Sequence, residues 1–452
     1  MRKRVHIQTM GCQMNVHDSA RMEDLLAPLG YAPWASPQGA ELVIVNTCAV
    51  REKAEDKVYS ALGRLAEIKA HRPGLLIAVA GCVAQARGAE ILSRSPCVDM
   101  VIGTHAMARV ARILEERIAT GRPVVDTAMA DSLPMAPLPG KRERFSAFVT
   151  IMSGCDNFCS YCVVPLVRGR EISRPPGEIL AEVRALADQG VVEVTLIGQN
   201  VNSYGKKEGM PGFPELLEQV HAVSGIKRLR FITSHPKDLS PGLMNAFSRL
   251  DKLCGHVHLP VQSGSDRMLV AMNRKYTTED YEKRLADLRR ARPGIAVTTD
   301  VIVGFPGETG DDYQRTLDLL VRAEFDGVFS FKYSDRPDTA ASRFPGKVSE
   351  DEKSRRLDRL NKLVNEIGFA KNRTLVGTVV QVLVDGISRK DPRAASGRGP
   401  DNRTVNFPVE NAQSLVGTFV DVAIEQGNVH SLWGRPVKSP GSTIVQEVTH
   451  AA

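Results

Sequence analysis

The sequence predicts an α/β protein of three parts: an amino-terminal domain with a doubly wound parallel sheet, a central partial (βα)6 barrel, and a small carboxy-terminal β-barrel. Three observations carry this prediction. Short apolar runs alternate with longer charged helical stretches through residue 120, and the alternation recurs about six times between residues 145 and 345. Beyond residue 373 the apolar runs are short, β-rich and separated by glycines. The length of 452 residues also favours several domains over one core.

The amino-terminal domain is expected over residues 1–120. Its predicted strands are 5–10, 42–45, 75–80 and 100–102, followed by helices at 18–29, 51–71, 84–93 and 106–120. Ligands of parallel sheets bind beyond the carboxyl ends of the strands, and Cys12, Cys48 and Cys82 each fall within about three residues of such an end. We therefore predict that these cysteines share one site. Three independent buried thiols are the alternative.

Residues 121–144 are rich in proline and lack strand or helix periodicity, so we expect an interdomain linker there. The central domain is expected over residues 145–372. Its predicted strands are 147–152, 193–197, 229–233, 256–261, 296–303 and 327–333, with amphipathic helices at 177–189, 213–223, 278–291 and 311–324 and a charged helix at 349–372. In such a barrel the loops that follow the strands form one active face.

The carboxy-terminal β-domain is expected over residues 373–438, with strands at 376–384, 404–409 and 418–424 and a disordered tail at 439–452. It holds nine Lys or Arg between Lys371 and Lys438 against six Asp or Glu. Cationic side chains position RNA through its phosphates without specifying sequence. The candidate RNA contacts are Arg389, Lys390, Arg393, Arg398 and Arg403, with Phe407 close behind. A solvated, glycine-rich loop is the alternative for each of these cations.

A second cysteine triplet follows the first strand of the predicted barrel. Cys155, Cys159 and Cys162 have the spacing CxxxCxxC, so three thiolates can converge from one loop. Three thiolates on a four-iron cluster leave one iron without a protein ligand, where a substrate or cofactor can bind. A zinc site that lacks a fourth ligand and three unrelated thiols are the alternatives. Structural zinc typically uses paired CxxC motifs, and the sequence shows no second CxxC or nearby histidine pair.

Cysteine usage and charge bound the setting of the protein. No long apolar leader follows Met1 and no apolar run approaches ~18 residues, so we expect a cytoplasmic protein without a membrane segment. In a reducing compartment eight cysteines favour metal or redox chemistry over disulfides. The net charge of +7 fits a polyanionic partner, although many proteins with such an excess bind none.

The motifs around both triplets resemble a known family. Tyr161 beside Cys162, in a βα-barrel, makes the loop similar to that of the radical S-adenosylmethionine superfamily. The flanks resemble its methylthiotransferases. The matching segments are MGCQMN (10–15), NTCAVREKA (46–54), AGCVAQ (80–85), VVP (163–165), RGR (168–170), SRP (173–175), LIGQNV (196–201), HLPVQSGS (258–265) and DVIVGFPGE (300–308). Residues 399–407, GPDNRTVNF, resemble the TRAM domain of those family members that act on N6-dimethylallyladenosine in tRNA.

The resemblance implies two 4Fe-4S clusters and S-adenosylmethionine as cofactors. The cluster on Cys155, Cys159 and Cys162 would cleave S-adenosylmethionine to a 5′-deoxyadenosyl radical, and the auxiliary cluster on Cys12, Cys48 and Cys82 would carry sulfur. Two S-adenosylmethionine molecules per turnover would place a methylthio group on carbon 2 of the adenine, in the anticodon loop of a tRNA. Such a loop suits a protein reader, because unpaired bases can be splayed out. An external one-electron donor is implied, and we expect a monomer.

Polar residues at the ends of the barrel strands are candidate contacts to S-adenosylmethionine. They are Tyr161, Gln199, Gln262, Ser263 and Asp300, and capping of the strand ends is their alternative role. Cys97 and Cys254 match no cluster motif, and we expect structural thiols there. Two alternative functions stay open within the family: modification of threonylcarbamoyladenosine in tRNA or of a ribosomal protein. A non-catalytic RNA-binding protein with structural iron or zinc is the alternative from another class.

Overall fold

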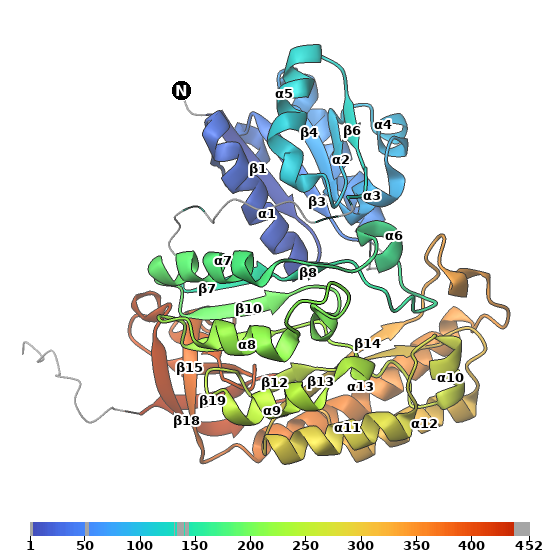
Figure 1. Cartoon of the computed structure of the whole chain (residues 1–452), viewed down its shortest axis with the longest axis vertical. Coiled ribbons are helices and arrows are strands. Elements are labelled where there is room, and N and C mark those ends of the chain that lie inside the picture. Colours follow the sequence, from blue (N-terminus) through green and yellow to red (C-terminus); the bar gives the residue numbers. More distant parts are fainter. Residues whose placement is uncertain (1–2, 50–53, 131, 133–139, 141–143, 438–452) are drawn as a thin grey trace, which may run out of the picture.

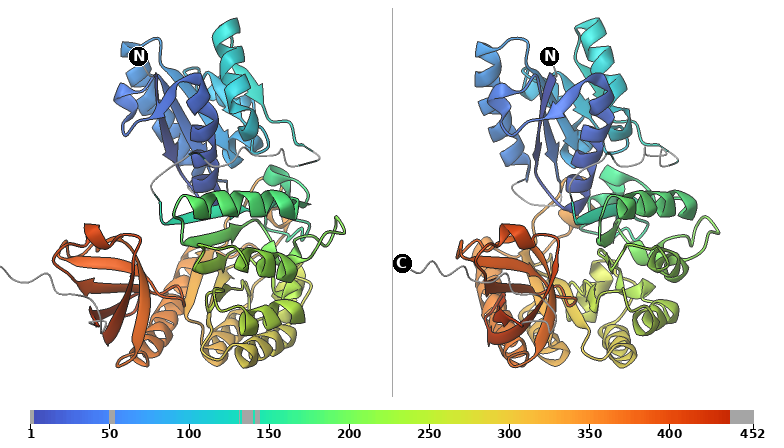
Figure 2. Two further views of the ribbon diagram at one scale, coloured as in Figure 1. Left: turned by 60° about the vertical axis from the view of Figure 1, so that its left-hand side comes forward. Right: turned by 90° about the vertical axis from the view of Figure 1, so that its left-hand side faces the viewer.

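A computed structural model describes residues 3–49, 54–130, 132, 140 and 144–437. The amino-terminal domain sits against one end of the central barrel, and the small β-barrel packs beside it (Figure 1). The two turned views show the same three-part arrangement (Figure 2). The predicted fold class is confirmed.

The amino-terminal domain has one six-stranded parallel sheet, in the order β2-β1-β3-β4-β5-β6. Its strands are β1 (Lys3–Thr9), β2 (Tyr31–Pro33), β3 (Leu42–Thr47), β4 (Leu76–Gly81), β5 (Met100–Ile102) and β6 (Val124–Asp126), and its helices are α1 (Gln13–Leu26), α2 (Ala54–His71), α3 (Cys82–Arg87), α4 (Glu90–Arg94) and α5 (Val110–Thr120). Both faces are covered: Met22 of α1 and Ile113 of α5 belong to one core, whereas Leu62 of α2 and Ile91 of α4 belong to the other.

Two edge strands of this sheet were not predicted. Strand β6 lies within residues 121–144, so the linker prediction is wrong for Val124–Asp126, which pair with β5. Strand β2 forms the other edge of the sheet, where it pairs with β1. Each has three residues, too few to show a strand periodicity. Most of the remaining predicted linker, at 131, 133–139 and 141–143, lies outside the described residues, as does the predicted tail.

The central domain is an open barrel of six parallel strands in two three-stranded sheets, β7-β10-β11 and β12-β13-β14. These strands are β7 (Ser146–Thr150), β10 (Glu193–Ile197), β11 (Arg228–Phe231), β12 (His256–His258), β13 (Ala296–Val303) and β14 (Gly327–Lys332). A parallel bridge between Leu229 and Leu253 joins the two halves. The short antiparallel pair β8 (Met152–Ser153) and β9 (Ile172–Ser173) flanks the cysteine loop.

Helices cover the outside of the barrel. They are α7 (Pro176–Asp188), α8 (Phe213–His221), α9 (Pro241–Arg249), α10 (Asp266–Ala271), α11 (Thr278–Ala291), α12 (Gly310–Ala323) and α13 (Glu350–Arg373), whereas α6 (Val164–Arg168) packs against α3 of the amino-terminal domain. Short 3₁₀ turns occur at Ala27–Leu29, Pro37–Gly39, Met107–Arg109, Val201–Ser203, Pro236–Asp238, Ala340–Arg343 and Gln413–Leu415. The apolar faces of α7, α8, α11 and α12 and the outer faces of the strands form one large core.

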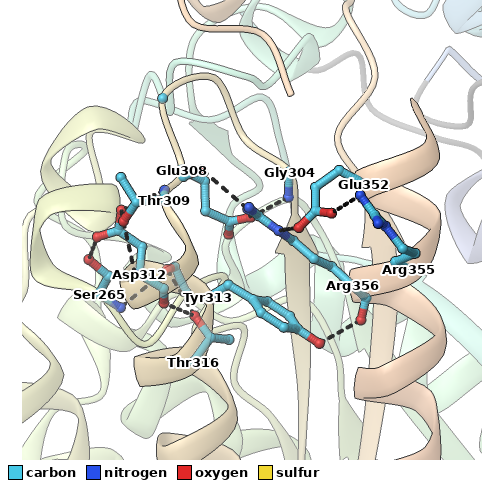
Figure 3. A network of polar contacts seen from close by, with 12 residues as sticks. Ser265, Gly304, Glu308, Thr309, Asp312, Tyr313, Thr316, Glu352, Arg355 and Arg356 are labelled. Atoms are coloured by element: carbon cyan, nitrogen blue, oxygen red, sulfur yellow. Dashed lines mark hydrogen bonds and ion pairs between the residues drawn. The ribbon is translucent and has the colours of Figure 1, made fainter. Parts of the chain in front are cut away.

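A buried polar network fixes the turn after β13 to helices α12 and α13 (Figure 3). The Glu308 carboxylate accepts a hydrogen bond from the Gly304 N–H at 2.6 Å and pairs with Arg356 of α13 at 2.6 Å. Asp312 caps α12 through the hydroxyl and N–H of Thr309. The turn thereby holds Phe305 edge-on to Tyr161, with ring centroids 6.5 Å apart. The segment 300–308 therefore positions the cysteine loop as well as ending a strand.

The carboxy-terminal domain is a closed five-stranded barrel in the order β15-β16-β17-β19-β18. Its strands are β15 (Val379–Ile387), β16 (Ala394–Arg398), β17 (Thr404–Pro408), β18 (Phe419–Gly427) and β19 (Leu432–Pro436), of which β16 and β19 were not predicted. Phe407 lies fully buried in its core. The prediction that Phe407 contacts RNA is therefore wrong, because its ring packs inside the barrel.

Candidate active site

All six motif cysteines line one cavity of about 500 Å³ between the amino-terminal domain and the open barrel. Cys12, Cys48 and Cys82 follow β1, β3 and β4, which are neighbours in the parallel sheet, so their carboxyl ends meet at one edge. Cys155, Cys159 and Cys162 come from the loop between β8 and α6. Three strand ends of one domain and one loop of another thus present six thiols to a single chamber. All eight cysteines are described, and none of them forms a disulfide.

The donor chemistry of each triplet fits an iron–sulfur cluster. Among the described residues no three Cys, His, Asp or Glu side chains converge as the ligands of a single ion would. A four-iron cluster is a larger body, held by thiolates that surround it. Three thiols facing a shared cavity, with no carboxylate lining it apart from Asp300, are the donor set such a cluster takes.

Two buried asparagines place the amino-terminal triplet, which we call the strand-end triplet (Cys12, Cys48 and Cys82). Asn15 donates from Nδ2 to Asn46 Oδ1 at 3.0 Å and to the Thr47 carbonyl at 2.8 Å, and its Oδ1 accepts the Cys12 N–H at 3.3 Å. Asn46 in turn donates to the Asn15 carbonyl at 2.9 Å. The asparagines of the MGCQMN and NTC segments therefore tie the start of α1 to the end of β3.

A glycine before each of two cysteines allows the strand ends to approach closely. At Gly81 a Cβ atom would lie 2.4 Å from the Thr47 carbonyl oxygen, and the φ of +92° disfavours any side chain. At Gly11 a Cβ atom would lie 2.7 Å from the Cβ of Cys48. The close approach of Cys12, Cys48 and Cys82 requires these glycines.

Arg168 of the barrel domain reaches the strand-end triplet. Its side chain is buried and donates from Nη2 to Asp18 Oδ2 of α1 at 2.9 Å, while its backbone carbonyl is 3.0 Å from His105 Nε2. The pKa of the Cys12 thiol is lowered to about 6, first because Cys48 hydrogen-bonds to it and further because the guanidinium of Arg168 is close. Burial raises the pKa of the Cys82 thiol, and the guanidinium of Arg168 partly offsets this increase. The barrel domain therefore supplies the cation of the amino-terminal site.

The second triplet, here the loop triplet (Cys155, Cys159 and Cys162), has its own buried cation. Arg274 donates from Nη1 to Cys159 Sγ at 3.3 Å and from Nη2 to the Pro260 carbonyl at 2.7 Å. Burial raises the pKa of the Cys155 thiol to about 11 and that of the Cys162 thiol to about 12. Both thiols are neutral at pH 7 in the absence of a cluster, so cluster binding there releases protons.

Four of the five predicted cofactor contacts line the cavity: Tyr161, Gln199, Gln262 and Asp300. Gln199 Oε1 accepts the Gly154 N–H at 2.6 Å, next to Cys155. Gln262 has a buried Oε1 without a hydrogen-bond partner among the described residues. An unpaired buried acceptor on a cavity wall suits a ligand that donates a hydrogen bond.

Ser263 does not reach the cavity, and its prediction as a cofactor contact is wrong. Its side chain is fully buried, its hydroxyl accepts the Ser265 N–H at 3.2 Å and it lies 3.4 Å from Thr316 Oγ1 of α12. The residue ends a strand by capping the following turn, the alternative role that such residues take.

Several cavity residues escaped sequence reasoning. Arg274, His256 and Phe329 line the chamber although no motif included them, and Asn402 lies in the 399–407 segment but was not predicted as a site residue. Asn402 comes from the carboxy-terminal barrel, whose 399–402 loop is held by two arginines of β11. Arg228 donates to the Arg398 carbonyl at 2.8 Å, and Arg230 donates to the Gly399 carbonyl at 2.7 Å. To predict such residues from the sequence, one would have to know which strands face the chamber.

The predicted RNA contacts divide into exposed and anchored residues. Arg389, Lys390 and Arg393 are exposed between β15 and β16. Arg398 is half-exposed and donates to the Asn402 carbonyl at 3.0 Å.

Arg403 is largely buried and pairs with Asp326 at 2.5 Å and Asp401 at 2.6 Å. The prediction of Arg403 as an RNA contact is therefore wrong, because its charge is used to join the two barrels.

The helices within the described residues include none with the length and apolar character of a membrane span.

Family models match the chain in three places. The Uncharacterized protein family UPF0004 matches residues 4–103, the Radical SAM superfamily matches residues 149–320, and the TRAM domain matches residues 373–437. These three matches correspond to the sheet domain, the open barrel and the small β-barrel.

Curated relatives match nearly the whole chain. A tRNA-2-methylthio-N(6)-dimethylallyladenosine synthase of Desulfosudis oleivorans is 48% identical over 97% of this chain and 98% of its own. One of the same name from Moorella thermoacetica is 49% identical over 96% of this chain and 99% of its own.

Solved structures share the fold at low identity. The radical S-adenosylmethionine methyltransferase TsrM from Kitasatospora setae superposes with a TM-score of 0.58, at 14% identity, over 84% of this chain and 80% of that chain. The radical enzyme OxsB gives 0.52 at 11% identity, over 80% of this chain and 56% of that chain. These likenesses concern the fold alone. The near full-length identity to curated relatives shows more: the chain belongs to the radical S-adenosylmethionine methylthiotransferases, in the family of the tRNA-2-methylthio-N(6)-dimethylallyladenosine synthases.

Proposed function

We propose that this protein replaces the hydrogen on carbon 2 of N6-dimethylallyladenosine, in the anticodon loop of a tRNA, with a methylthio group, using two S-adenosylmethionine molecules per turnover. The observation that carries the proposal is the single cavity that both cysteine triplets line. A sulfur source and a radical source must act on the same carbon, and one chamber allows this. The names of the relatives support the choice of substrate.

The six cysteines would hold the two clusters, one on each triplet. When bound, the loop-triplet cluster supplies an electron for cleavage of S-adenosylmethionine, and the strand-end cluster supplies a binding position for sulfur. Arg274 and Arg168 each place one positive charge against the thiolates of a triplet. Thiolates that ligate iron are anionic, so both guanidinium groups stabilise the charge that accumulates at their triplet.

Tyr161, Gln199, Gln262 and Asp300 are the groups we assign to binding and orienting S-adenosylmethionine. The buried Oε1 of Gln262 is free to accept a hydrogen bond from the ligand. Asp300 lies 3.3 Å from His258 Nε2 and offers a carboxylate to a ligand amino or hydroxyl group. Apolar walls such as Ile197, Ile232 and Val167 limit the access of water to the chamber.

The carboxy-terminal barrel would hold the tRNA through its exposed cations Arg389, Lys390, Arg393 and Arg398. Contacts of this kind follow the phosphate backbone, and their strength falls with salt. We further propose that the protein acts as a cytoplasmic monomer and receives electrons from an external one-electron donor. None of its eight cysteines forms a disulfide, which supports a reducing compartment.

The test is anaerobic reconstitution with iron and sulfide, followed by incubation with reductant, S-adenosylmethionine and dimethylallyl-modified tRNA. Mass spectrometry of the digested RNA should show the methylthio nucleoside. The product should be lost with Cys12→Ala and with Cys155→Ala but retained with Cys97→Ala, because Cys97 lies outside the cavity. Cleavage of S-adenosylmethionine without RNA modification would overturn the substrate, and no reaction at full iron loading would overturn the enzymatic proposal.

A further inference from the structure

Strand β14 carries two large aromatic side chains that are exposed to solvent. Phe329 is 56% exposed and Phe331 is 49% exposed. They are two residues apart, so both rings point to the same face of the strand. Ser330 between them bonds to Asn361 of α13 on the opposite face. The two phenylalanines therefore face away from helix α13 and toward the interior of the open barrel.

Phe329 lines the chamber that both triplets share. In the sheet register it lies beside Asp300 of β13, and its ring meets the edge of His258, with centroids 5.7 Å apart at 70°. Strand β14 is the last strand of its sheet, so no further strand covers it. The open edge of the barrel thus brings an aromatic surface to the mouth of the reaction chamber.

This exposure has no explanation in packing. Single exposed apolar residues are common on protein surfaces, but two aromatic rings on one face of an edge strand, one of them lining the chamber, form a defined apolar surface. The residues of β12 and β13 that line the chamber are polar, namely His256, His258, Thr298 and Asp300. Proteins that read unpaired RNA stack splayed bases on aromatic side chains of this kind.

We propose that Phe329 and Phe331 form a stacking platform for unpaired nucleobases of the RNA loop. Phe329 receives the base that enters the chamber, and Phe331 receives a neighbouring base. Residues two apart on a strand are separated by about 7 Å, whereas stacked bases rise by about 3.4 Å. Two bases on this platform are therefore unstacked from one another, which leaves the target base free to turn into the chamber. This inference rests on the proposed function and assigns the base-binding part of that site.

The experiment measures binding of an anticodon stem-loop RNA to the anaerobic holoenzyme by fluorescence anisotropy. Phe329→Leu and Phe331→Leu keep an apolar side chain and remove the aromatic face. Phe369→Leu is the matched control, because Phe369 is 42% exposed on α13 and is not among the residues that line the chamber. Three RNAs are compared: the loop with dimethylallyladenosine, the same loop with adenosine, and a fully paired duplex of the stem. Iron content per chain checks that each variant carries both clusters.

Loss of one stacked base weakens binding about 5- to 150-fold by alanine substitution. We expect Phe329→Leu and Phe331→Leu to lose affinity toward the low end of that range for both loop RNAs. Duplex binding should be unchanged, and Phe369→Leu should bind all three RNAs as the wild type does.

Wild-type affinity of Phe329→Leu for the loop overturns the platform. So does a loss confined to the dimethylallyl RNA, because the ring would then contact only the alkyl tail. If the wild type modifies the loop but the variants bind it normally, only this inference fails. If the wild type neither binds nor modifies the loop, the proposed function fails with it.

Discussion

The two cysteine triplets reach the same cavity by opposite routes. The loop triplet comes from eight consecutive residues between β8 and α6, whereas the strand-end triplet draws one cysteine from each of three strands spread over some 70 residues. A loop can be specified locally, by spacing alone. The strand-end site exists only when β1, β3 and β4 are in register, so its geometry depends on the packing of a whole domain. The difference predicts that distant changes damage the strand-end site more than the loop site.

The largest expected effect tests the close approach of strand ends. Gly81→Ala should abolish iron binding at the strand-end triplet, because its Cβ would collide with the Thr47 carbonyl at a positive φ. Iron per chain should fall by about half, with the loop-triplet signal retained in the electron paramagnetic resonance spectrum. Gly63→Ala is the control: nothing lies within 4 Å of its Cβ in the middle of α2, so it should gain about 0.5–1 kcal/mol of stability. Full iron content in Gly81→Ala would break the comparison.

The second prediction concerns pH. Metal ligation needs thiolates, and the raised pKa values of Cys155 and Cys162, about 11 and about 12, keep both protonated at neutral pH. Iron affinity of the loop triplet should therefore rise with pH, by up to about tenfold per unit for each of the two thiols. Cys12, with a pKa lowered to about 6, is already ionised at pH 7 and adds no such slope above it, whereas burial raises the pKa of Cys82, so the strand-end triplet keeps a shallower slope from that thiol. Iron titrations between pH 7 and pH 9 on variants that keep a single triplet measure both slopes, and equal slopes would contradict this account.

The third prediction compares two asparagines. Asn15→Ala removes the four hydrogen bonds of its side chain, two of them from Cys12, and leaves buried partners unpaired, so it should cost about 2 kcal/mol in the free energy of unfolding. Asn157→Ala removes a single bond to Cys155 Sγ, 3.3 Å long, and should cost about 1 kcal/mol or less. Denaturant unfolding of the apoprotein gives both numbers. A larger cost for Asn157→Ala would mean that the loop triplet depends on the surrounding structure more than the strand-end triplet does.

The smallest effect concerns the two buried arginines. A cation beside a cluster stabilises the extra electron of the reduced state, so Arg274→Gln should lower the reduction potential at the loop triplet. Arg168→Gln should do the same at the strand-end triplet. A tenfold change in the one-electron equilibrium corresponds to about 59 mV, which spectroscopic redox titration resolves. Unchanged potentials would show that the arginines hold the fold without influencing the clusters.

What the sequence could predict follows from the same contrast. The loop triplet, the six barrel strands and the strands that precede Cys12, Cys48 and Cys82 are coded in contiguous residues, and the structure has each of them. The edge strands β2 and β6 are too short to show a period. Arg403 and Phe407 are of residue types that commonly contact RNA. Only the folded barrel shows that Arg403 pairs with Asp326 and that Phe407 fills the core. Burial of Arg168 and Arg274 likewise depends on contacts between segments far apart in sequence.

The hydrogen bonds from Arg228 and Arg230 to the small barrel have a consequence for how such enzymes diversify. Both side chains hold backbone carbonyls, of Gln381 and Arg398 and of Gly399, which every amino acid possesses. These bonds therefore do not depend on the side chains of residues 399–402, although Asp401 pairs with Arg403 and so also supports the joint between the two barrels. Asn402, at the end of that loop, lines the chamber, and its φ of +67° favours Asn or Gly at this position. The backbone of the joint thus narrows the set of side chains that evolution can place against the nucleoside there.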